Sequence, residues 1–195
     1  LLLQNIPISK KNMNNKNTFD YCLKIGRKEK KEEKKLTKAE EQKLDFYLSI
    51  LEKTDPERLD RNDHCAFYIN AYNARTIKLV LTRYPGVKSI KDIGSLFQSP
   101  WKKKIVRLNE KTFSLDEIEH QILRPRFKDP RVHFAIKCAS KGCPPLLSEP
   151  YRGATLDAQL HKVTHDFLNA PENYRLEGDT FWVSSLFKWF SEDFG

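Results

Sequence analysis

Hydrophobic positions near the start of the well-patterned part of the chain follow helical spacing. Leu44, Leu48 and Leu51 recur at intervals of three and four residues, which is the spacing of one face of an α-helix. Thr37 precedes this stretch and is followed three residues later by Glu40. Ser or Thr followed by Glu at that distance is the signature of a capping box. The pattern therefore predicts a helix that begins just after Thr37.

A second helix is predicted over Asp63–Tyr84, since apolar residues line one face and Pro85-Gly86 would end it. Asn70 and Asn73 lie three residues apart on that face. Asparagine costs free energy when it is buried without hydrogen-bond partners. The pair therefore predicts a polar role, which is either hydrogen bonding to a neighbouring loop or the lining of a ligand pocket.

Shorter segments follow in the second half of the chain. Alternation and turn residues predict two hairpins, an apolar run predicts a strand, and helical spacing predicts three further helices. The hairpins are expected at 104–113 and 174–183, the strand at Val132–Ile136, and the helices after Ser114, at 155–169 and at 186–190. This order of elements predicts the α+β class, with helices packed on a small, mostly antiparallel sheet.

Composition divides the chain into two parts. Residues 1–36 are dominated by Lys, Glu, Asn and Gln and are expected to be a basic tail or linker, disordered or partly helical. Residues 37–195 are expected to form a single α+β domain, truncated at its C-terminus, because the strongly apolar stretch 186–194 needs a surface to pack against. Leu1–Leu3 is interpreted as a fragment edge or a signal-peptide remnant, so localisation is left open between cytoplasm and export.

The charge and the apolar runs limit the expected partners. The net charge is +9, but no basic motif with interleaved aromatics is present, so no nucleic-acid partner is expected. The longest apolar run, Cys65–Ile69, is far short of the ~20 residues of a membrane span. No glycine-rich phosphate loop is present, and no cofactor is expected. The expected partner is a small-molecule or peptide-like ligand, and the sequence does not determine the oligomeric state.

Side chains suited to chemistry at neutral pH are concentrated at Glu119, His120, His133, Cys138 and Cys143. A straight strand after Val132 would hold His133 and Cys138 about 16–17 Å apart and on opposite faces. His120 is therefore the preferred partner of the Cys138 thiol, unless the chain turns back after the strand. Glu119 is turned from His120 by about 100° along the helix, and is expected to orient His133 or fix a substrate.

Three interpretations of this cluster stay open. The first is a thiol hydrolase or acyltransferase, in which Cys138 attacks and an imidazole moves the proton. The second is a zinc site made by the two histidines and two cysteines, although their spacing is unusual for zinc. The third is structural, with a Cys138–Cys143 disulfide or buried thiols, in a noncatalytic binding or scaffold module.

The most distinctive segments of the chain resemble the bacterial and plant family called domain of unknown function 547. They are F-Y-I-N-A-Y-N-A, S-L-D-E-I-E-H-Q-I-L-R-P, D-P-R-V-H-F-A-I-K-C-A-S-K-G-C-P-P-L and L-F-K-W-F-S-E-D-F. The resemblance implies an α+β domain, often in exported bacterial proteins, with a suggested likeness to papain-type thiol hydrolases. Cys65 and Lys137 depart from the family pattern, and Cys65 is excluded from any site.

The leading hypothesis is thiol-dependent acyl transfer or hydrolysis on a peptide-like substrate. Its catalytic residues are expected to be Cys138, His120, His133 and Glu119. Its substrate-binding residues are expected to be Asn70, Asn73, Cys143 and Arg131. No metal ligand is part of this assignment.

Overall fold

The computed structural model describes residues 37–83, 93, 99–138 and 143–195. The expected basic tail at 1–36, the expected helix end at Pro85-Gly86 and the loop 139–142 lie outside these residues. The described helices are α3 (Lys38–Lys53), α4 (Arg61–Leu81), α5 (Leu115–Glu117), α6 (Arg124–Phe127), α7 (Val132–Ala135), α8 (Leu156–Leu168), α9 (Ser185–Trp189) and α10 (Ser191–Phe194). A π-helical segment, Ile118–Leu123, joins α5 to α6 without a break.

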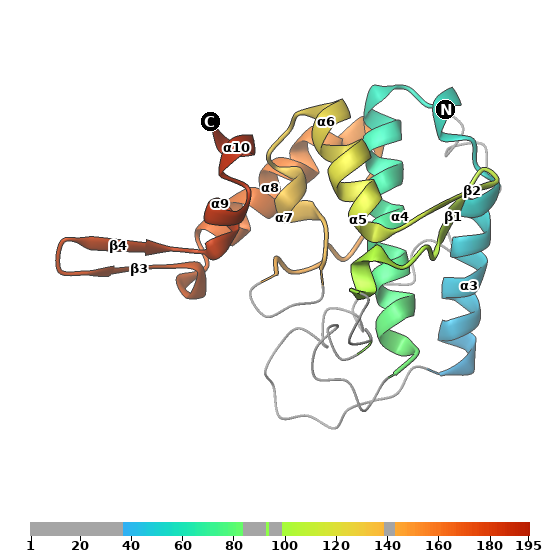
Figure 1. Ribbon diagram of the computed structural model, residues 1–195, viewed down its shortest axis with the longest axis horizontal. Helices are drawn as coiled ribbons and strands as arrows, with labels where there is room; N and C mark the ends of the chain where they lie inside the picture. Colours follow the sequence, from blue (N-terminus) through green and yellow to red (C-terminus); the bar gives the residue numbers. More distant parts are fainter. Residues whose placement is uncertain (1–36, 84–92, 94–98, 139–142) are drawn as a thin grey trace.

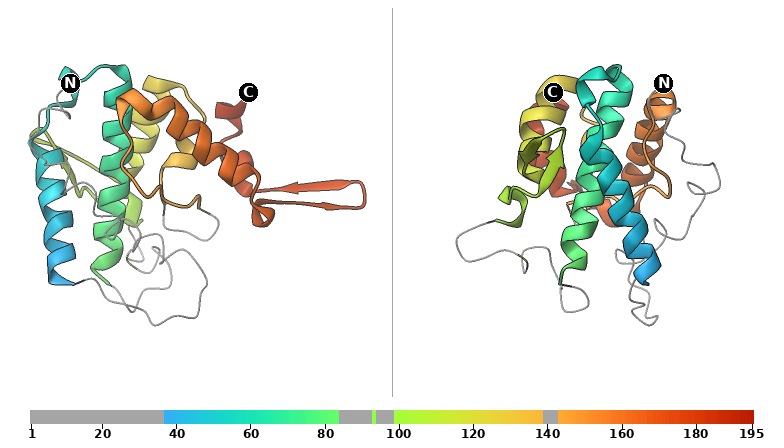
Figure 2. Two further views of the ribbon diagram at one scale, coloured as in Figure 1. Left: turned by 180° about the vertical axis from the view of Figure 1, so that it is seen from behind. Right: turned by 90° about the vertical axis from the view of Figure 1, so that its right-hand side faces the viewer.

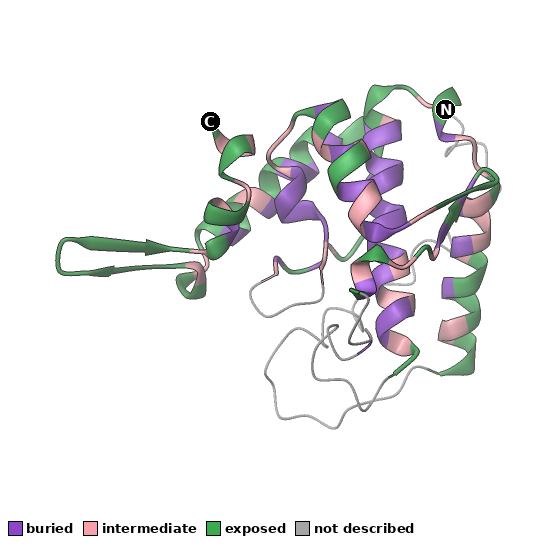
Figure 3. Cartoon of the chain, viewed as in Figure 1, coloured by how far each residue is buried: buried purple, intermediate pink, exposed green. Residues whose placement is uncertain are grey.

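Helix α4 is the centre of the molecule. Figures 1 and 2 show it between α3, the α5–α6 helix and α8. Every side chain from His64 to Ala74 is buried, as the purple colour of α4 in Figure 3 shows. A helix buried on all sides is expected only in the middle of a core. Its polar side chains must therefore find partners on the elements around it.

The helix starts agree with the capping signals. Thr37 accepts from the backbone N–H of Glu40, whose carboxylate accepts from the Thr37 N–H. Ser114 and Glu117 form the same reciprocal arrangement at the start of α5. Both capping boxes are confirmed, because the motif depends only on residues that are close in sequence.

The strands form two separate antiparallel hairpins. Strand β1 (Val106–Leu108) pairs with β2 (Lys111–Phe113), and β3 (Tyr174–Glu177) pairs with β4 (Thr180–Val183). Both predicted hairpins are confirmed, as is the α+β class. The strands of the two hairpins do not pair with one another, so the expected small sheet is present as two two-stranded pieces.

The prediction of a strand at Val132–Ile136 is wrong. These residues form the short helix α7, of which all four members are buried. Asp129 begins the turn by accepting from the Arg131 N–H, and its carbonyl accepts from the Val132 N–H. A short apolar run fits a buried helix as well as a buried strand, so periodicity alone could not distinguish them.

A glycine lets α4 and the start of α8 approach closely. The Gly153 N–H donates to Asp63 Oδ1 at 2.8 Å, and a Cβ on Gly153 would lie 2.2 Å from that same oxygen. Any larger residue would push the chain away from the first turn of α4. This contact fixes where α8 begins, next to the 3-10 turn Gly153–Thr155.

Candidate functional site

The π-helical segment Ile118–Leu123 carries two of the predicted site residues in different directions. Glu119 points inward and is 9% exposed, whereas His120 lies on the outer surface. The two neighbouring side chains thus point in different directions, as their rotation of about 100° along the helix predicts. A π-helical segment widens the helix by one residue per turn, and such segments are frequent at functional sites. Here the widening directs the Glu119 carboxylate towards α4 and α7.

His133 is the buried centre of the site. It lies on α7, and its Nε2 is 2.6 Å from Oδ2 of Asp193 on α10. The ring of Phe190 stacks on the imidazole with centroids 3.9 Å apart. On the other edge of the ring, Nδ1 lies 4.0 Å from Oε1 of Glu119 and has no hydrogen-bond partner. Glu119 also accepts from the Tyr72 hydroxyl on α4 at 3.2 Å.

Burial and charge determine the protonation of this group. Loss of hydration lowers the pKa of His133 and raises the pKa of Glu119. Hydrogen bonding to Arg124 lowers the pKa of Asp193. Asp193 is therefore an ionised acceptor at neutral pH, so His133 is neutral with its proton on Nε2. The unprotonated Nδ1 then faces the Glu119 carboxyl at 4.0 Å, which is too far for a direct hydrogen bond.

Arg124 links the buried group to His120. Its guanidinium makes two hydrogen bonds to Asp193, at 2.5 and 3.1 Å, in the fork geometry that Arg forms with carboxylates. Its Nη1 also lies 3.0 Å from Nδ1 of His120. Because a guanidinium only donates, His120 Nδ1 accepts and the His120 proton is on Nε2. A hydrogen-bonded network thus joins His133, Asp193, Arg124 and His120. The Tyr72–Glu119 pair lies next to this network, across the 4.0 Å gap between Glu119 and His133.

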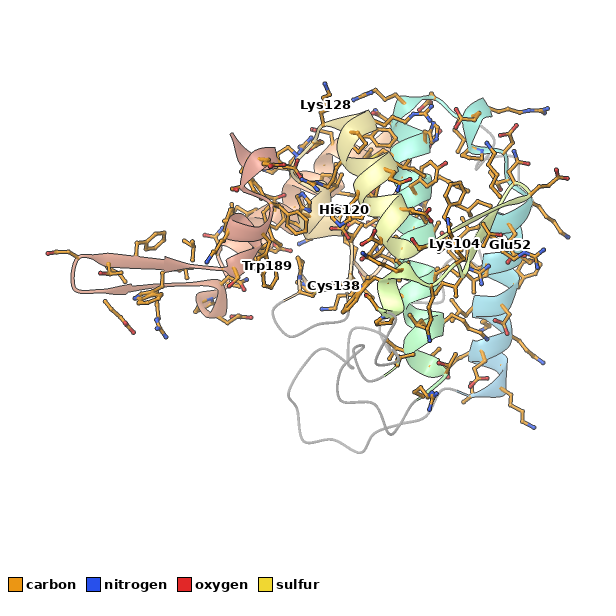
Figure 4. All side chains as sticks on the ribbon, in the orientation of Figure 1. Glu52, Lys104, His120, Lys128, Cys138 and Trp189 are labelled. Carbon is orange, nitrogen blue, oxygen red and sulfur yellow. A yellow bond between two sulfur atoms is a disulfide. The ribbon has the colours of Figure 1, made fainter. Side chains whose placement is uncertain are left out.

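A cavity of about 400 Å³ lies beside this network. We call it the α6–α10 cavity, and its walls come from the helix ending in α6, the following loop and α10. The lining residues are His120, Arg124, Pro125, Lys128, Asp129, Pro130, Val132, Glu192 and Asp193. Figure 4 labels His120 and Lys128 along the α6 side. Its size is in the range of small-molecule sites.

Cys138 and Cys143 form a disulfide bond, as in the structural alternative derived from the sequence. A disulfide sulfur has no ionisable proton, so Cys138 is not a thiolate nucleophile in this state. The amine of Lys137 donates to the Cys143 carbonyl at 3.1 Å, and burial lowers its pKa to about 8. Figure 4 shows Cys138 on the chain after α7, and Cys138 is not among the residues that line the α6–α10 cavity.

The two asparagines of α4 hold neighbouring backbone. Asn70 donates to the Tyr151 carbonyl at 2.8 Å and accepts from the Tyr151 N–H at 2.9 Å. Asn73 donates to the carbonyl of Ala135 at 2.9 Å and accepts from the N–H of Lys137 at 2.7 Å. Each amide thus both donates to and accepts from the backbone of a neighbouring segment. This is the first of the two alternatives that the sequence left open, hydrogen bonding to a neighbouring loop. Asn73 fixes the chain immediately before Cys138.

Arg131 is engaged by two carboxylates. It pairs with Asp129 at 2.8 Å and with Asp157 at 2.9 Å, and these hydrogen bonds raise its pKa. The pairs join the loop before α7 to the first turn of α8. Cys143, the remaining predicted substrate-binding residue, is the second half of the disulfide.

Sequence reasoning did not find Arg124, Phe190 or Asp193 as site residues. Arg124 lies in the segment S-L-D-E-I-E-H-Q-I-L-R-P, and the other two lie in L-F-K-W-F-S-E-D-F. All three residues therefore lie within the segments on which the family resemblance rests. Asp193 is 60 positions from His133, and no local pattern shows that α10 packs onto α7.

The described part of the chain contains neither a group of metal ligands nor a helix that could span a membrane. Within it, no group of three or more His, Cys, Asp or Glu side chains is placed so that it could hold a metal ion. None of the described helices has the length and apolar character needed to cross a bilayer.

Comparisons with known proteins identify the family. The model of the family described as "Protein of unknown function, DUF547" matches residues 56–168, which is more than half of the chain. The match contains α4, the π-helical segment, His133 and both cysteines of the disulfide. Comparison with curated proteins and with solved structures gave no significant match. The chain belongs to the DUF547 family.

Proposed function

We propose that this domain binds a small peptide-like ligand, carrying one positive and one negative group, in the α6–α10 cavity. Two charged side chains of opposite sign at the cavity carry this proposal. Lys128 has no ion-pair partner among the described residues. Glu192 is 91% exposed and reaches Arg124 only at 4.0 Å. A ligand carboxylate could bind Lys128, and a ligand ammonium group could bind Glu192.

The other charges of the cavity are already balanced. Arg124 and Asp193 neutralise one another through two hydrogen bonds, and Asp129 is neutralised by Arg131. Because these side chains are already held in place, ordering them costs little free energy when a ligand binds. His120 adds an Nε2–H donor, because its Nδ1 accepts from Arg124.

The backbone at Lys128 gives independent support. Lys128 has a φ of 53° and ends α6 in the left-handed conformation. Glycine or asparagine normally occupies this position, because other residues pay a conformational cost of about 1 kcal/mol there. Strain of this kind is frequently stored at ligand sites. A lysine at this position supplies a cation to the cavity at the expense of stability.

This strain allows binding and stability to be tested separately. Lys128→Gly removes the cation and relieves the backbone, so it should weaken binding while raising the free energy of unfolding by about 0.5–1 kcal/mol. Glu110→Gly is the matched control, since Glu110 has a φ of 63° and lies in the β1–β2 turn, outside the lining of the cavity. It should stabilise the domain similarly and leave binding unchanged.

Dialanine is the probe, and its binding to the full chain is monitored by NMR titration. Saturable shifts at His120 and Lys128 are expected with dialanine. N-acetylalanine, which lacks the ammonium group, and alaninamide, which lacks the carboxylate, should bind at least about 10-fold more weakly, corresponding to one lost ionic contact. Equal binding by all three compounds, or equal binding to wild type and Lys128→Gly, would contradict the proposal.

Thiol-dependent acyl transfer or hydrolysis is a second candidate, available only after reduction of the disulfide. The observation that favours it is the buried amine of Lys137, next to Cys138, whose pKa is lowered to about 8. A partly charged amine at this position would stabilise a thiolate. The thiolate would attack a carbonyl to form a thioester, an imidazole would protonate the leaving amine, and water would then release the acid.

Alkylation rates test this second candidate with an internal control. Cys65 is buried, and loss of hydration raises its pKa to about 12. After reduction, in a Cys22→Ser background, iodoacetamide at pH 6–7 should modify Cys138 faster than a model thiol and leave Cys65 almost untouched. A Cys138 rate at or below that of the model thiol would exclude an activated nucleophile.

A further inference from the structure

The hairpin β3–β4 has two chemically different faces. Residues that lie opposite each other in an antiparallel pair project from the same face. The register places Tyr174 opposite Val183 and Leu176 opposite Phe181, so these four apolar side chains share one face. We call it the apolar hairpin face. Arg175, Trp182, Glu177 and Thr180 occupy the other side.

The polar face satisfies itself. Arg175 pairs with Glu177 at 3.0 Å, and its guanidinium lies 5.1 Å from the ring centroid of Trp182. Surface contacts of this kind contribute at most about 1 kcal/mol each, but they leave both charges with a partner. This face therefore needs no further partner.

The apolar hairpin face is uncovered among the described residues. Its four side chains are 41–70% exposed, and every residue of both strands is coloured as exposed in Figure 3. Figure 1 shows the hairpin projecting away from the rest of the described molecule. A two-stranded hairpin is marginally stable in water by itself. An apolar face of this size is typical of an interaction surface.

We propose that a second copy of this chain covers the apolar hairpin face, with the two hairpins packed face to face and antiparallel about a two-fold axis. The apolar hairpin face carries no charge, so it can pack against itself without burying an ion. Two sheets packed in this way lie about 10 Å apart with interdigitated side chains. The same patch on both subunits is the commonest arrangement in soluble dimers.

Charges at the two ends of the hairpin favour the antiparallel arrangement. The tip carries the exposed Asp179, and the base carries two exposed charges, Glu172 before β3 and Lys188 on α9. Neither Asp179 nor Lys188 has an ion-pair partner among the described residues. In the antiparallel arrangement Asp179 of each copy lies at the end of the other copy that carries Lys188. A parallel arrangement would bring the two acidic tips together and is disfavoured by like-charge repulsion.

The exposed apolar area at the hairpin is most of what a dimer interface requires. The four side chains of the face, together with Trp189, which is 70% exposed at the hairpin base, offer on the order of 600–700 Å² per copy. Figure 4 labels Trp189 beside the point where the hairpin joins α9. A standard stable interface buries about 800 Å² per partner. The hairpin face therefore supplies most of the required surface.

Sedimentation of the full chain over a concentration series tests the proposal. Wild type should be a dimer, and Phe181→Glu should weaken dimerisation at least about 30-fold, as expected for a central interface residue. Trp182→Glu makes the same aromatic-to-carboxylate change at the adjacent position on the polar face, opposite Arg175, and should remain dimeric. A wild-type chain that stays monomeric at high micromolar concentration would overturn the proposal, because some other occupant would then have to cover the face.

A second test exchanges the charges of Asp179 and Lys188, which lie outside the two strands, and so leaves the strand residues unchanged. Lys188→Glu should weaken the dimer by roughly 5-fold or more, since the contact occurs twice. Adding Asp179→Lys to the same chain should restore most of the lost affinity, because the exchanged charges attract again. If the double variant dimerises no better than Lys188→Glu alone, the antiparallel arrangement is wrong. If the Phe181→Glu and Trp182→Glu variants dimerise equally, the proposed face is wrong.

Discussion

The part of the molecule around α4, which we call the body, and the C-terminal arm, residues 171–195, are stabilised in different ways. In the body, α4 is buried on all sides from His64 to Ala74, and the other elements pack onto it. In the arm, both strands of the hairpin are exposed along their whole length. The body is stabilised by burial of apolar side chains, whereas the hairpin is stabilised mainly by the backbone hydrogen bonds between its two strands.

The arm meets the body at the candidate site. Phe190 stacks on His133, Asp193 bonds to His133 and Arg124, and Leu186 is buried against the core. The family match ends before the arm begins. The α6–α10 cavity therefore takes one wall from the matched region and one from the arm, and its shape depends on a junction made by few residues.

The largest expected effect comes from truncating one phenylalanine in each region. Phe134 in α7 is 2% exposed, and Phe181 in β4 is 62% exposed. Phe134→Ala should lower the free energy of unfolding by about 3–5 kcal/mol, because it leaves a cavity in the core. Phe181→Ala should change it by no more than about 0.5 kcal/mol. Urea unfolding at low protein concentration measures both, and similar losses would show that the arm is not the weaker region.

The next effect concerns the amide contacts of the body. Asn73→Ala removes the partners of the Ala135 carbonyl and the Lys137 N–H, and should cost roughly 2–4 kcal/mol, because both groups are left unsatisfied. Asn169→Ala is the control, since its exposed amide bonds only to the His165 carbonyl. It should cost no more than about 0.5 kcal/mol. A loss below about 1 kcal/mol for Asn73→Ala would mean that water replaces the amide.

The junction itself should be of intermediate strength. Asp193→Asn replaces an ion pair with a neutral contact to Arg124 and should cost about 1–2 kcal/mol. Glu192→Gln, which changes a neighbouring carboxylate that is 91% exposed, should cost a few tenths of a kcal/mol at most. Urea unfolding gives the free energies, and NMR of the His133 ring reports whether α10 stays in place. Equal effects of the two changes would show that Asp193 does not anchor the arm.

Local signals predicted the elements of the fold, but not the way they meet. Thr37 with Glu40 and Ser114 with Glu117 predicted helix starts correctly, because a capping box needs only four consecutive positions. The turn residues of both hairpins were equally informative. The error at Val132 arose because a buried apolar run has no distinguishing period.

The candidate site was predicted only in part, for the same physical reason. His133 and Glu119 lie together, as expected, with 4.0 Å between Nδ1 and Oε1. Their partner Asp193 comes from a distant helix, and its role depends on tertiary packing. The asparagines were correctly singled out as buried polar groups that need hydrogen-bond partners, and their assignment to substrate binding stays a prediction. Only the fold could show that these partners are backbone groups.

The pH dependence of stability gives the smallest and most specific test of the junction. Burial lowers the pKa of His133 in the folded state, so the unfolded state binds more protons as the pH falls below about 6.5, the ordinary value for histidine. The free energy of unfolding should then decrease with falling pH, by at most about 1.4 kcal/mol per pH unit for this one group. His64, whose pKa burial also lowers, acts in the same direction.

Substitutions separate the groups that contribute to this slope. His133→Gln cannot gain a proton, so its free energy of unfolding should fall less than that of wild type between pH 6.5 and 5, whereas the exposed His161→Gln should match wild type. Glu119 acts in the opposite direction, because burial raises its pKa and the folded state binds the proton more readily. Glu119→Gln removes this opposing contribution, so its decrease in stability on acidification should be steeper than that of wild type. Urea unfolding at several pH values measures all four slopes, and equal slopes for wild type and His133→Gln would show that His133 is protonated as easily in the folded chain as in water.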